Sequence, residues 1–205
     1  MKEIKLPDIE ANKQAFIKIA TENIAREGIN KLLAWLEKTD FYTAPASTRF
    51  HGDYEGGLCE HSLNVYNTLN KLCADYEITE FTPETIAIIA LFHDICKVKF
   101  YKRDFRNVKN EETGKWEKQE VWAIDEALPL GHGEKSCILV QGCMPLNVNE
   151  LLAIRWHMAG YDKGVIGGDS LTISNAAAKT KLVGLLQCAD MIASQLLEFS
   201  AEDIK

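Results

Sequence analysis

A stretch near the middle of the chain is apolar on almost every side. Residues 83–98, PETIAIIALFHDICKV, follow Thr82, which suits an N-cap, and begin with Pro83, which suits the first helical position. A helix that is apolar all round belongs inside a protein rather than on its surface. The chain is therefore expected to fold as a helical bundle with this helix at its centre. The last turn of the helix carries three polar residues: His93, Asp94 and Lys97.

Six further segments have apolar residues at helical spacing: 8–27, 29–40, 57–76, 133–143, 147–158 and 175–199. Gly28 is expected to end the first, and Asn147 with Glu150 resembles a capping box that opens the fifth. The last segment is expected to be one long helix with a shared face: Val183, Leu186, Asp190, Ala193 and Leu197. The pattern predicts a mostly all-α fold of about six or seven helices.

Residues 99–125 have a different pattern. Two arms rich in aromatic and β-branched residues flank the polar sequence NEETG, which is typical of a β-hairpin. We interpret this hairpin as an insertion over the functional site. No Pro/Gly/Ser-rich linker divides the sequence, so residues 1–205 are expected to form a single domain, with N-terminal helices in residues 1–40 packed on a core of residues 41–200.

Charge and hydropathy argue against some classes of partner. A formal net charge of −7 argues against general affinity for nucleic acids or anionic membranes, because both require a basic surface. The longest apolar run, residues 86–92, is far shorter than the roughly 20 residues that cross a bilayer, and the N-terminus is too polar for a secretory signal. We expect a cytoplasmic protein without a membrane partner, and with its six cysteines reduced and buried.

Histidines and aspartates occur where apolar residues would be expected. Three of the five histidines, His61, His93 and His157, fall on or next to apolar helical faces. Asp190 does the same in the last segment. A single histidine on such a face is most often a core residue with one hydrogen bond. Burying an unpaired carboxylate is much more costly, so Asp94 and Asp190 each need a positive partner.

A divalent metal would supply that positive charge. Imidazole nitrogen and carboxylate oxygen are suitable ligands for Zn, Fe, Mn or Ni. The adjacent His93 and Asp94 are the most informative pair. Successive helical residues diverge by about 100° and do not in general face one point. At the last turn of a helix, however, the two side chains can converge on one ion, or the aspartate can lie between two.

The order of these residues resembles the HD-domain superfamily of metal-dependent phosphohydrolases, whose signature is H…HD…D on the helices of an all-α bundle. The sequence GGLCEHSLNVY, which contains His61, resembles the superfamily's GGLxEHSLxV. LFHDICK, which contains His93 and Asp94, resembles its LxHDxGK, and Asp190 takes the place of the late aspartate. Cys96 stands where the family usually has glycine, which removes no ligand.

The resemblance also implies a set of metal ligands. Some members of the superfamily carry two more histidines between the HD pair and the late aspartate, and these hold a second metal that the aspartate of the pair bridges. By that comparison, one metal would be bound by His61, His93, Asp94 and Asp190, and the other by His132, His157 and Asp94. The alternative is a mononuclear site, in which His132 and His157 line the pocket and contact phosphate. The ions would be divalent: Mn, Fe, Ni, Co, Zn or Mg.

Such a centre suits the hydrolysis of phosphate esters. Two ions about 3.5–4 Å apart lower the pKa of a bound water from about 15.7 toward 7 and draw charge from a phosphoryl oxygen. Lys97 resembles the family's cationic neighbour of the HD pair, and Asp94 and Lys97 are the expected catalytic residues. Candidates for binding phosphate are Arg49, His51 and Lys135. The expected substrate is a small phosphomonoester or phosphodiester, with nucleotides as the favoured class, attacked at phosphorus by a metal-activated hydroxide.

Two other functions share this pattern. The mixed-valent di-iron oxygenases of the superfamily, typified by myo-inositol oxygenase, have the same ligand set and cleave C–C or C–P bonds with O₂. A non-catalytic nucleotide-binding HD module would keep the pocket and lack turnover. Metal analysis with an O₂-uptake assay distinguishes the first of these, and tight nucleotide binding without turnover would identify the second.

Overall fold

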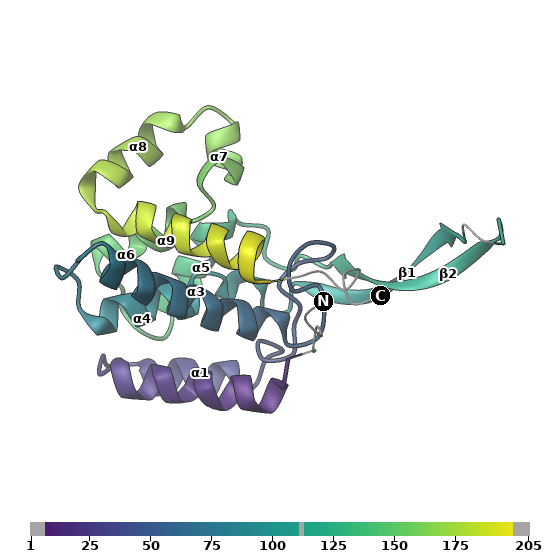
Figure 1. The fold of residues 1–205 in the computed structure, drawn as a ribbon, viewed down its shortest axis with the longest axis horizontal. Coiled ribbons are helices and arrows are strands. Elements are labelled where there is room, and N and C mark those ends of the chain that lie inside the picture. The colour runs from purple at the N-terminus through teal and green to yellow at the C-terminus, as the bar shows by residue number, and fades with distance from the viewer. Residues whose placement is uncertain (1–6, 111–112, 199–205) are drawn as a thin grey trace.

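The computed structural model describes residues 7–110 and 113–198, which form a helical bundle with one projecting β-hairpin (Figure 1). Nine α-helices occur in this part of the chain: α1 (Ile9–Asn23), α2 (Ile29–Leu36), α3 (Gly57–Asp75), α4 (Pro83–Phe92), α5 (His132–Gln141), α6 (Val148–Trp156), α7 (Lys163–Ile166), α8 (Ser170–Lys179) and α9 (Leu182–Ile192). The shorter elements are two 3₁₀ turns, η1 (Ile95–Lys97) and η2 (Ala159–Tyr161), a π turn, η3 (Ala193–Leu197), and two strands, β1 (Tyr101–Lys109) and β2 (Trp116–Ile124). The predicted mostly α fold with a small hairpin is confirmed.

The apolar segment forms the buried helix α4, as predicted. The Thr82 hydroxyl caps it by accepting a hydrogen bond from the Thr85 amide at 3.2 Å, and every residue from Thr85 to Phe92 is buried. Helices α1, α3 and α6 pack against α4 and share one apolar core with it. The helix ends at Phe92, earlier than the sequence pattern suggests, and η1 follows after Asp94.

Helices α1 and α2 cover one side of the bundle, opposite α7 and α8 (Figure 1). The ring of Phe16 in α1 lies 5.0 Å from that of Phe41 and 5.7 Å from that of Phe92, centroid to centroid. Gly28 does not end the first helix, because α1 already ends at Asn23. Gly28 instead precedes α2 with a φ of 99°, a conformation that residues with a Cβ rarely adopt.

The last predicted helix is divided in two, so the expectation of one helix over residues 175–199 is wrong. Thr180 separates α8 from α9 with an extended backbone (φ −152°, ψ 134°), and its hydroxyl accepts a hydrogen bond from the Leu182 amide at 3.4 Å. A hydroxyl that bonds to a nearby amide competes in this way with helix continuation. Leu197, expected on the buried face, is 57% exposed. Phe199 lies outside the described residues.

The hairpin projects away from the bundle (Figure 1), so most of it does not lie over the site, contrary to the interpretation from sequence. At its base, Ile124 lines the cavity described below. Its strands are antiparallel, with Tyr101 opposite Ile124 and Lys109 opposite Trp116. All of β1 beyond Tyr101 is exposed, because a two-stranded ribbon has no third layer to cover either face. At the base, the Tyr101 hydroxyl donates a hydrogen bond to the Ala46 carbonyl at 3.2 Å, which anchors the hairpin to the body.

Two expectations drawn from composition concern the cysteines and the membrane. All six cysteines are free, and Cys59, Cys96 and Cys137 are buried as predicted. Cys73 and Cys143 are half-buried, and Cys188 is exposed on α9, so the expectation of burial is wrong there. Within residues 7–110 and 113–198, no helix has both the length and the apolar character that crossing a membrane requires.

Candidate metal centre

The end of α4 turns His93 and Asp94 toward one point. His93 keeps a helical conformation (φ −58°, ψ −36°), whereas Asp94 leaves the helix (φ −103°, ψ 13°). In a continuous helix the two side chains would diverge by about 100°. Here the Oδ2 atom of Asp94 lies 3.7 Å from the Nε2 atom of His93, and both side chains are buried. The HD pair therefore converges where the helix stops.

His61 approaches the same point from α3. Its Nε2 atom lies 3.2 Å from Nε2 of His93 and 3.5 Å from Oδ2 of Asp94. The start of α3 requires a glycine, because a Cβ on Gly57 would overlap the carbonyl oxygen of Gly52. The preceding loop can therefore lie directly against the first turn of the helix that carries His61.

His132 and His157 approach Asp94 from its other side. The Oδ1 atom of Asp94 lies 2.6 Å from Nε2 of His132 and 3.4 Å from Nε2 of His157. Helices α5 and α6 come very close here, since a Cβ on Gly133 would overlap the backbone of Arg155. The glycine next to His132 thus lets the two imidazole rings come within 5.2 Å, centroid to centroid.

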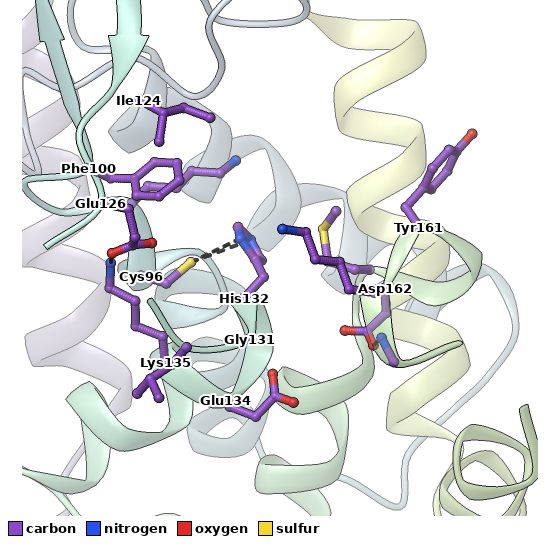
Figure 2. A pocket seen from close by; sticks show the side chains of 15 residues that line it. Cys96, Phe100, Ile124, Glu126, Gly131, His132, Glu134, Lys135, Tyr161 and Asp162 are labelled. Carbon is purple, nitrogen blue, oxygen red and sulfur yellow. Dashed lines mark hydrogen bonds and ion pairs between the residues drawn. The ribbon is translucent and has the colours of Figure 1, made fainter. Parts of the chain in front are cut away.

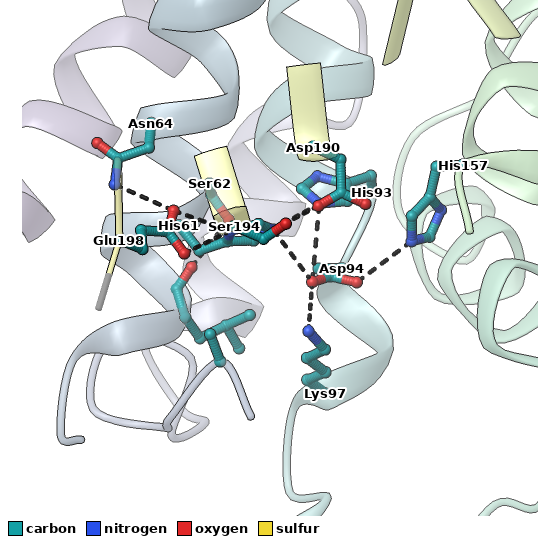
Figure 3. A network of polar contacts seen from close by, with 12 residues as sticks. His61, Ser62, Asn64, His93, Asp94, Lys97, His157, Asp190, Ser194 and Glu198 are labelled. Atoms are coloured by element: carbon teal, nitrogen blue, oxygen red, sulfur yellow. Dashed lines mark hydrogen bonds and ion pairs between the residues drawn. The ribbon is translucent and has the colours of Figure 1, made fainter. Parts of the chain in front are cut away.

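Asp190 completes the group from α9. Its Oδ1 atom lies 3.3 Å from Nε2 of His61, and its side chain is 18% exposed. Figure 3 shows Asp190, His61 and His157 directed toward the region around Asp94. The structure thus brings together all six residues that were predicted to bind metal, from five separate helical segments.

The hydrogen bonds of the histidines leave lone pairs directed into this centre. His93 donates from Nδ1 to the Ala90 carbonyl at 2.8 Å, and His157 donates from Nδ1 to the Ile154 carbonyl at 2.7 Å. A neutral imidazole that donates from Nδ1 presents a lone pair at Nε2. The Nε2 atom of His157 is buried and has no hydrogen-bond partner in the described residues. This atom faces Oδ1 of Asp94 at 3.4 Å without a hydrogen bond, and a buried ring nitrogen directed at a carboxylate in this way is the arrangement that a metal ligand requires.

The donor set fits divalent metal ions. Four groups of side chains among the described residues each have ligand atoms within 4.8 Å of one another: His61, His93 and Asp94; His93, His157 and Asp190; Asp94, His132 and His157; and His51, His61 and Glu198. Imidazole nitrogens combined with carboxylate oxygens suit borderline divalent ions, and the cations would compensate the buried carboxylates.

Comparison with known families identifies this arrangement. The model for the HD domain family matches residues 58–193, well over half of the chain, and this range contains every predicted metal ligand from His61 to Asp190. The chain belongs to the HD domain family. No curated protein and no solved structure matches it. The resemblance inferred from the H…HD…D order is therefore confirmed at the level of the family.

The six residues that converge around Asp94, here called the HD centre, have their charges largely balanced by neighbouring side chains of the chain. Burial would raise the pKa of Asp94, but Lys97 and the neighbouring histidines outweigh burial and hold that pKa well below its usual value. Burial lowers the pKa of His93 to about 3, so this imidazole is neutral and its Nε2 lone pair is available. For His61, burial is outweighed by Glu198 and Asp190, which raise its pKa to about 10. Without a metal, the His61 ring is therefore protonated on both nitrogens and positively charged, and it lies between the carboxylates of Glu198 and Asp190.

Lys97 and His132 connect the HD centre to a cavity of about 300 Å³ (Figure 2). The Nζ atom of Lys97 lies 2.6 Å from Oδ2 of Asp94, and this buried lysine also lines the cavity. Phe100 and Met158 supply part of an apolar wall. Among the described residues, the lining includes neither His61 nor Asp190. The cavity thus reaches the centre from the side of His132.

Cys96, the departure from the usual family sequence, also lies at this cavity. Its Sγ atom is 3.3 Å from Nδ1 of His132, a contact drawn in Figure 2. Burial raises the pKa of the Cys96 thiol to about 12, so the group is neutral. The cysteine therefore removes no ligand, and its thiol lies against the imidazole of His132.

The three residues predicted to bind phosphate lie in different surroundings. Lys135 is buried in the cavity wall, where its Nζ atom lies 2.7 Å from Oε1 of Glu126. The ring of His51 is 5.0 Å from that of His61, and burial lowers its pKa to about 4, so it is neutral at pH 7. Arg49 is exposed and lines a separate groove beside the hairpin. The structure thus brings His51 and Lys135 close to the centre and leaves Arg49 apart from it.

One buried carboxylate at the centre, Glu198, was not predicted from the sequence. Its Oε1 atom lies 3.0 Å from Nδ1 of His61, and its side chain is 2% exposed. A glutamate after two leucines at the end of an amphipathic helix gives little signal in a single sequence.

Proposed function

We propose that this HD-family chain is a metal-dependent phosphohydrolase for a small phosphomonoester or phosphodiester, with nucleotides as the expected class. The observation that carries the proposal is the position of Asp94, whose two carboxylate oxygens face separate pairs of histidines. Such a carboxylate suits a bridge between two divalent ions. One ion would be held by His61, His93, Asp94 and Asp190, and the other by Asp94, His132 and His157.

Divalent ions in this centre would lower the pKa of a water molecule and withdraw charge from a phosphoryl oxygen. The chain contributes the groups that hold and complement this chemistry. For Lys97, burial is outweighed by Asp94, so its pKa is raised above the usual lysine value and the side chain stays charged. A fixed cation that lines the cavity beside Asp94 would stabilise negative charge as it develops on the phosphoryl group.

The size of the cavity favours a small substrate. A volume of about 300 Å³ is at the lower end of the range for ligand pockets. Phe100 and Met158 would contact the apolar part of a leaving group, while Lys97 and His132 lie at the end nearest the centre. The net charge of −7 favours a small-molecule partner over general nucleic-acid binding. Six free cysteines are consistent with a reducing, cytoplasmic location.

The test is a screen of phosphate esters and nucleotides against Mn, Co, Ni, Fe, Zn and Mg, using purified chain stripped of metal. We expect release of phosphate with at least one ester and one metal, and none from Asp94→Ala. Oxygen uptake with iron as the sole active metal would replace the proposal with an oxygenase. Tight nucleotide binding without turnover across the metal panel would replace it with a binding module.

A further inference from the structure

We propose that Glu198 is a positioning residue for His61 and that it makes the His61 side of the centre the first to bind a metal ion. This inference rests on the proposed metal-dependent function. It concerns Nδ1 of His61, the ring nitrogen that faces away from the metal position, because the partner of Nδ1 determines which nitrogen carries the proton.

Both carboxylate oxygens of Glu198 lie near one nitrogen of His61. Oε1 is 3.0 Å and Oε2 is 3.1 Å from Nδ1, and Oε1 also accepts a hydrogen bond from the Asn64 amide at 3.1 Å (Figure 3). A carboxylate can only accept, so Nδ1 of His61 must donate. The Nε2 atom, which faces His93, Asp94 and Asp190, then keeps its lone pair for a metal when the ring carries a single proton.

The π turn η3 explains how Glu198 reaches this position. Asp190 and Leu197 would share a face in a regular α-helix, because seven residues at about 100° each make almost two full turns. A π turn uses i→i+5 hydrogen bonds and so adds about one residue to the turn. The Glu198 amide donates to the Ala193 carbonyl at 3.1 Å, which is such a bond. Glu198 therefore takes the inward position that Leu197 would otherwise have, and Leu197 is 57% exposed.

The four histidines at the metal positions differ in what accepts their Nδ1 protons. His93 and His157 donate to neutral backbone carbonyls, and Nδ1 of His132 lies 3.3 Å from the neutral thiol of Cys96. Of these four, His61 has the charged partner. A carboxylate behind a ligating imidazole fixes its orientation and makes it a stronger donor.

The two sides of Asp94 consequently differ in charge. On the Oδ2 side lie two further carboxylates, Asp190 and Glu198, whose charge is partly offset by Lys97 at 2.6 Å from Oδ2. On the Oδ1 side, the groups that contact Asp94 among the described residues are the imidazoles of His132 and His157. A dication that takes the place of the proton on Nε2 of His61 is therefore attracted more strongly to the Oδ2 side. The first ion should bind there, and the second should bind more weakly beside His132.

Metal titration of three proteins tests this assignment: the wild type, Glu198→Gln and Glu60→Gln. Glutamine keeps the shape of Glu198 but removes its charge and allows the amide to donate to Nδ1. Glu60 is a matched control, because it precedes His61 on α3 and its carboxylate accepts a hydrogen bond from the Tyr54 hydroxyl at 2.7 Å rather than from a histidine. Calorimetry with Mn²⁺ would give the affinities, and the visible absorption of bound Co²⁺ would report the geometry of the first site.

Glu198→Gln should weaken the first binding event by about 10- to 100-fold, change the Co²⁺ spectrum and leave the second event nearly unchanged. Glu60→Gln should leave both events unchanged. Equal weakening of both events in Glu198→Gln, or unaltered binding, would overturn the role of Glu198. A wild-type chain that binds no divalent ion would instead overturn the proposed function. If the wild type binds a single ion, the dinuclear centre is wrong, and the effect of Glu198→Gln on that ion still decides whether Glu198 acts on the His61 site.

Discussion

The two sides of Asp94 differ in enclosure as well as in charge. On the Oδ2 side, His61 and His93 are at most 1% exposed. On the Oδ1 side, the His132 side chain is 26% exposed and lines the cavity. A ligand in the cavity therefore meets the centre beside His132, and among the described residues the cavity lining does not include His61. We therefore expect the Oδ2 side to retain metal and the Oδ1 side to face the substrate, with Asp94 and Lys97 between them.

The largest effect should come from the residue that the two sides share. Asp94→Ala removes the carboxylate that faces four histidines, so we expect loss of both ions and a fall in turnover on the order of 10³-fold or more. Metal content by mass spectrometry and phosphate release should fall together. Asp169→Ala, at an exposed position before α8, is the control and should match the wild type. Retention of either ion by Asp94→Ala would break the comparison, because the two sides would then not depend on a common ligand.

Single histidine variants should separate the two sides. His132→Ala should lose the weaker ion and keep the tighter one, while His61→Ala should lose the tighter ion. Both variants should turn over poorly, since each lacks a complete centre, and metal stoichiometry is therefore the informative measurement. The reverse pattern, with the tighter ion missing from His132→Ala, would assign the first binding event to the cavity side.

Lys97→Met should affect turnover more than metal binding. The lysine contacts Asp94 and lines the cavity, so its loss removes a cation near the reacting phosphoryl group; we expect a fall in kcat of about 10²-fold. Metal affinity should be unchanged or higher, because Asp94 loses a competing positive charge. The metal-free variant should unfold at a lower temperature than the metal-free wild type, since Asp94 is left buried without its lysine partner. Parallel losses of metal and turnover would instead mean that Lys97 supports the ligands.

Much of the centre was predictable from the sequence because its residues violate local patterns. His61 and Asp190 are polar residues on apolar faces, and Thr82 with Pro83 marks the start of α4. Because α4 is buried, the carboxylate of Asp94 at its end needs a positively charged partner. The capping box at Asn147 is also present, and it opens α6, whose C-cap residue is His157.

The predictions from the sequence fail where the chain departs from regular helical geometry. The end of α4 at Phe92 and the break at Thr180 involve residues that are compatible with continued helix, so periodicity alone extends through both. The π turn shifts the register by one residue, which turns Leu197 outward and Glu198 inward, and helical periodicity in the sequence does not indicate this shift. Distance along the chain was also a poor guide to phosphate contacts: Arg49 is near His61 in sequence but lies in a different groove.

The metal-free protein should be most stable near pH 6.5, because its histidines shift in opposite directions. Burial lowers the pKa of His61, but Glu198 and Asp190 outweigh burial and raise that pKa to about 10. The contribution of His61 to stability is therefore complete below pH 6.5 and is lost as the pH rises toward 10. Burial lowers the pKa of His93 to about 3, so its contribution is lost as the pH falls from 6.5 toward 3.

Thermal unfolding with a chelator, from about pH 5 to about pH 9, checks this expectation. His61→Ala should lose less stability than the wild type on the alkaline side, because the titrating pair with Glu198 is gone. Saturating metal should have a similar effect, since it replaces the proton on His61. If the unfolding temperature of the metal-free wild type instead rises steadily up to about pH 9, the charge of protonated His61 does not stabilise the fold.

The smallest effect should come from the cavity wall. Lys135 lies 2.7 Å from Glu126, and its Nζ atom is 5.1 Å from the centre of the Phe100 ring. Because Glu126 already neutralises it, Lys135→Met should raise KM for a phosphate ester only a few-fold, and kcat and both metal affinities should stay close to wild type. Arg49→Ala is the matched control, since it removes a cation from the groove beside the hairpin and should leave KM unchanged. A larger rise in KM for Arg49→Ala than for Lys135→Met would mean that the substrate binds in the groove of Arg49 rather than in the cavity beside His132.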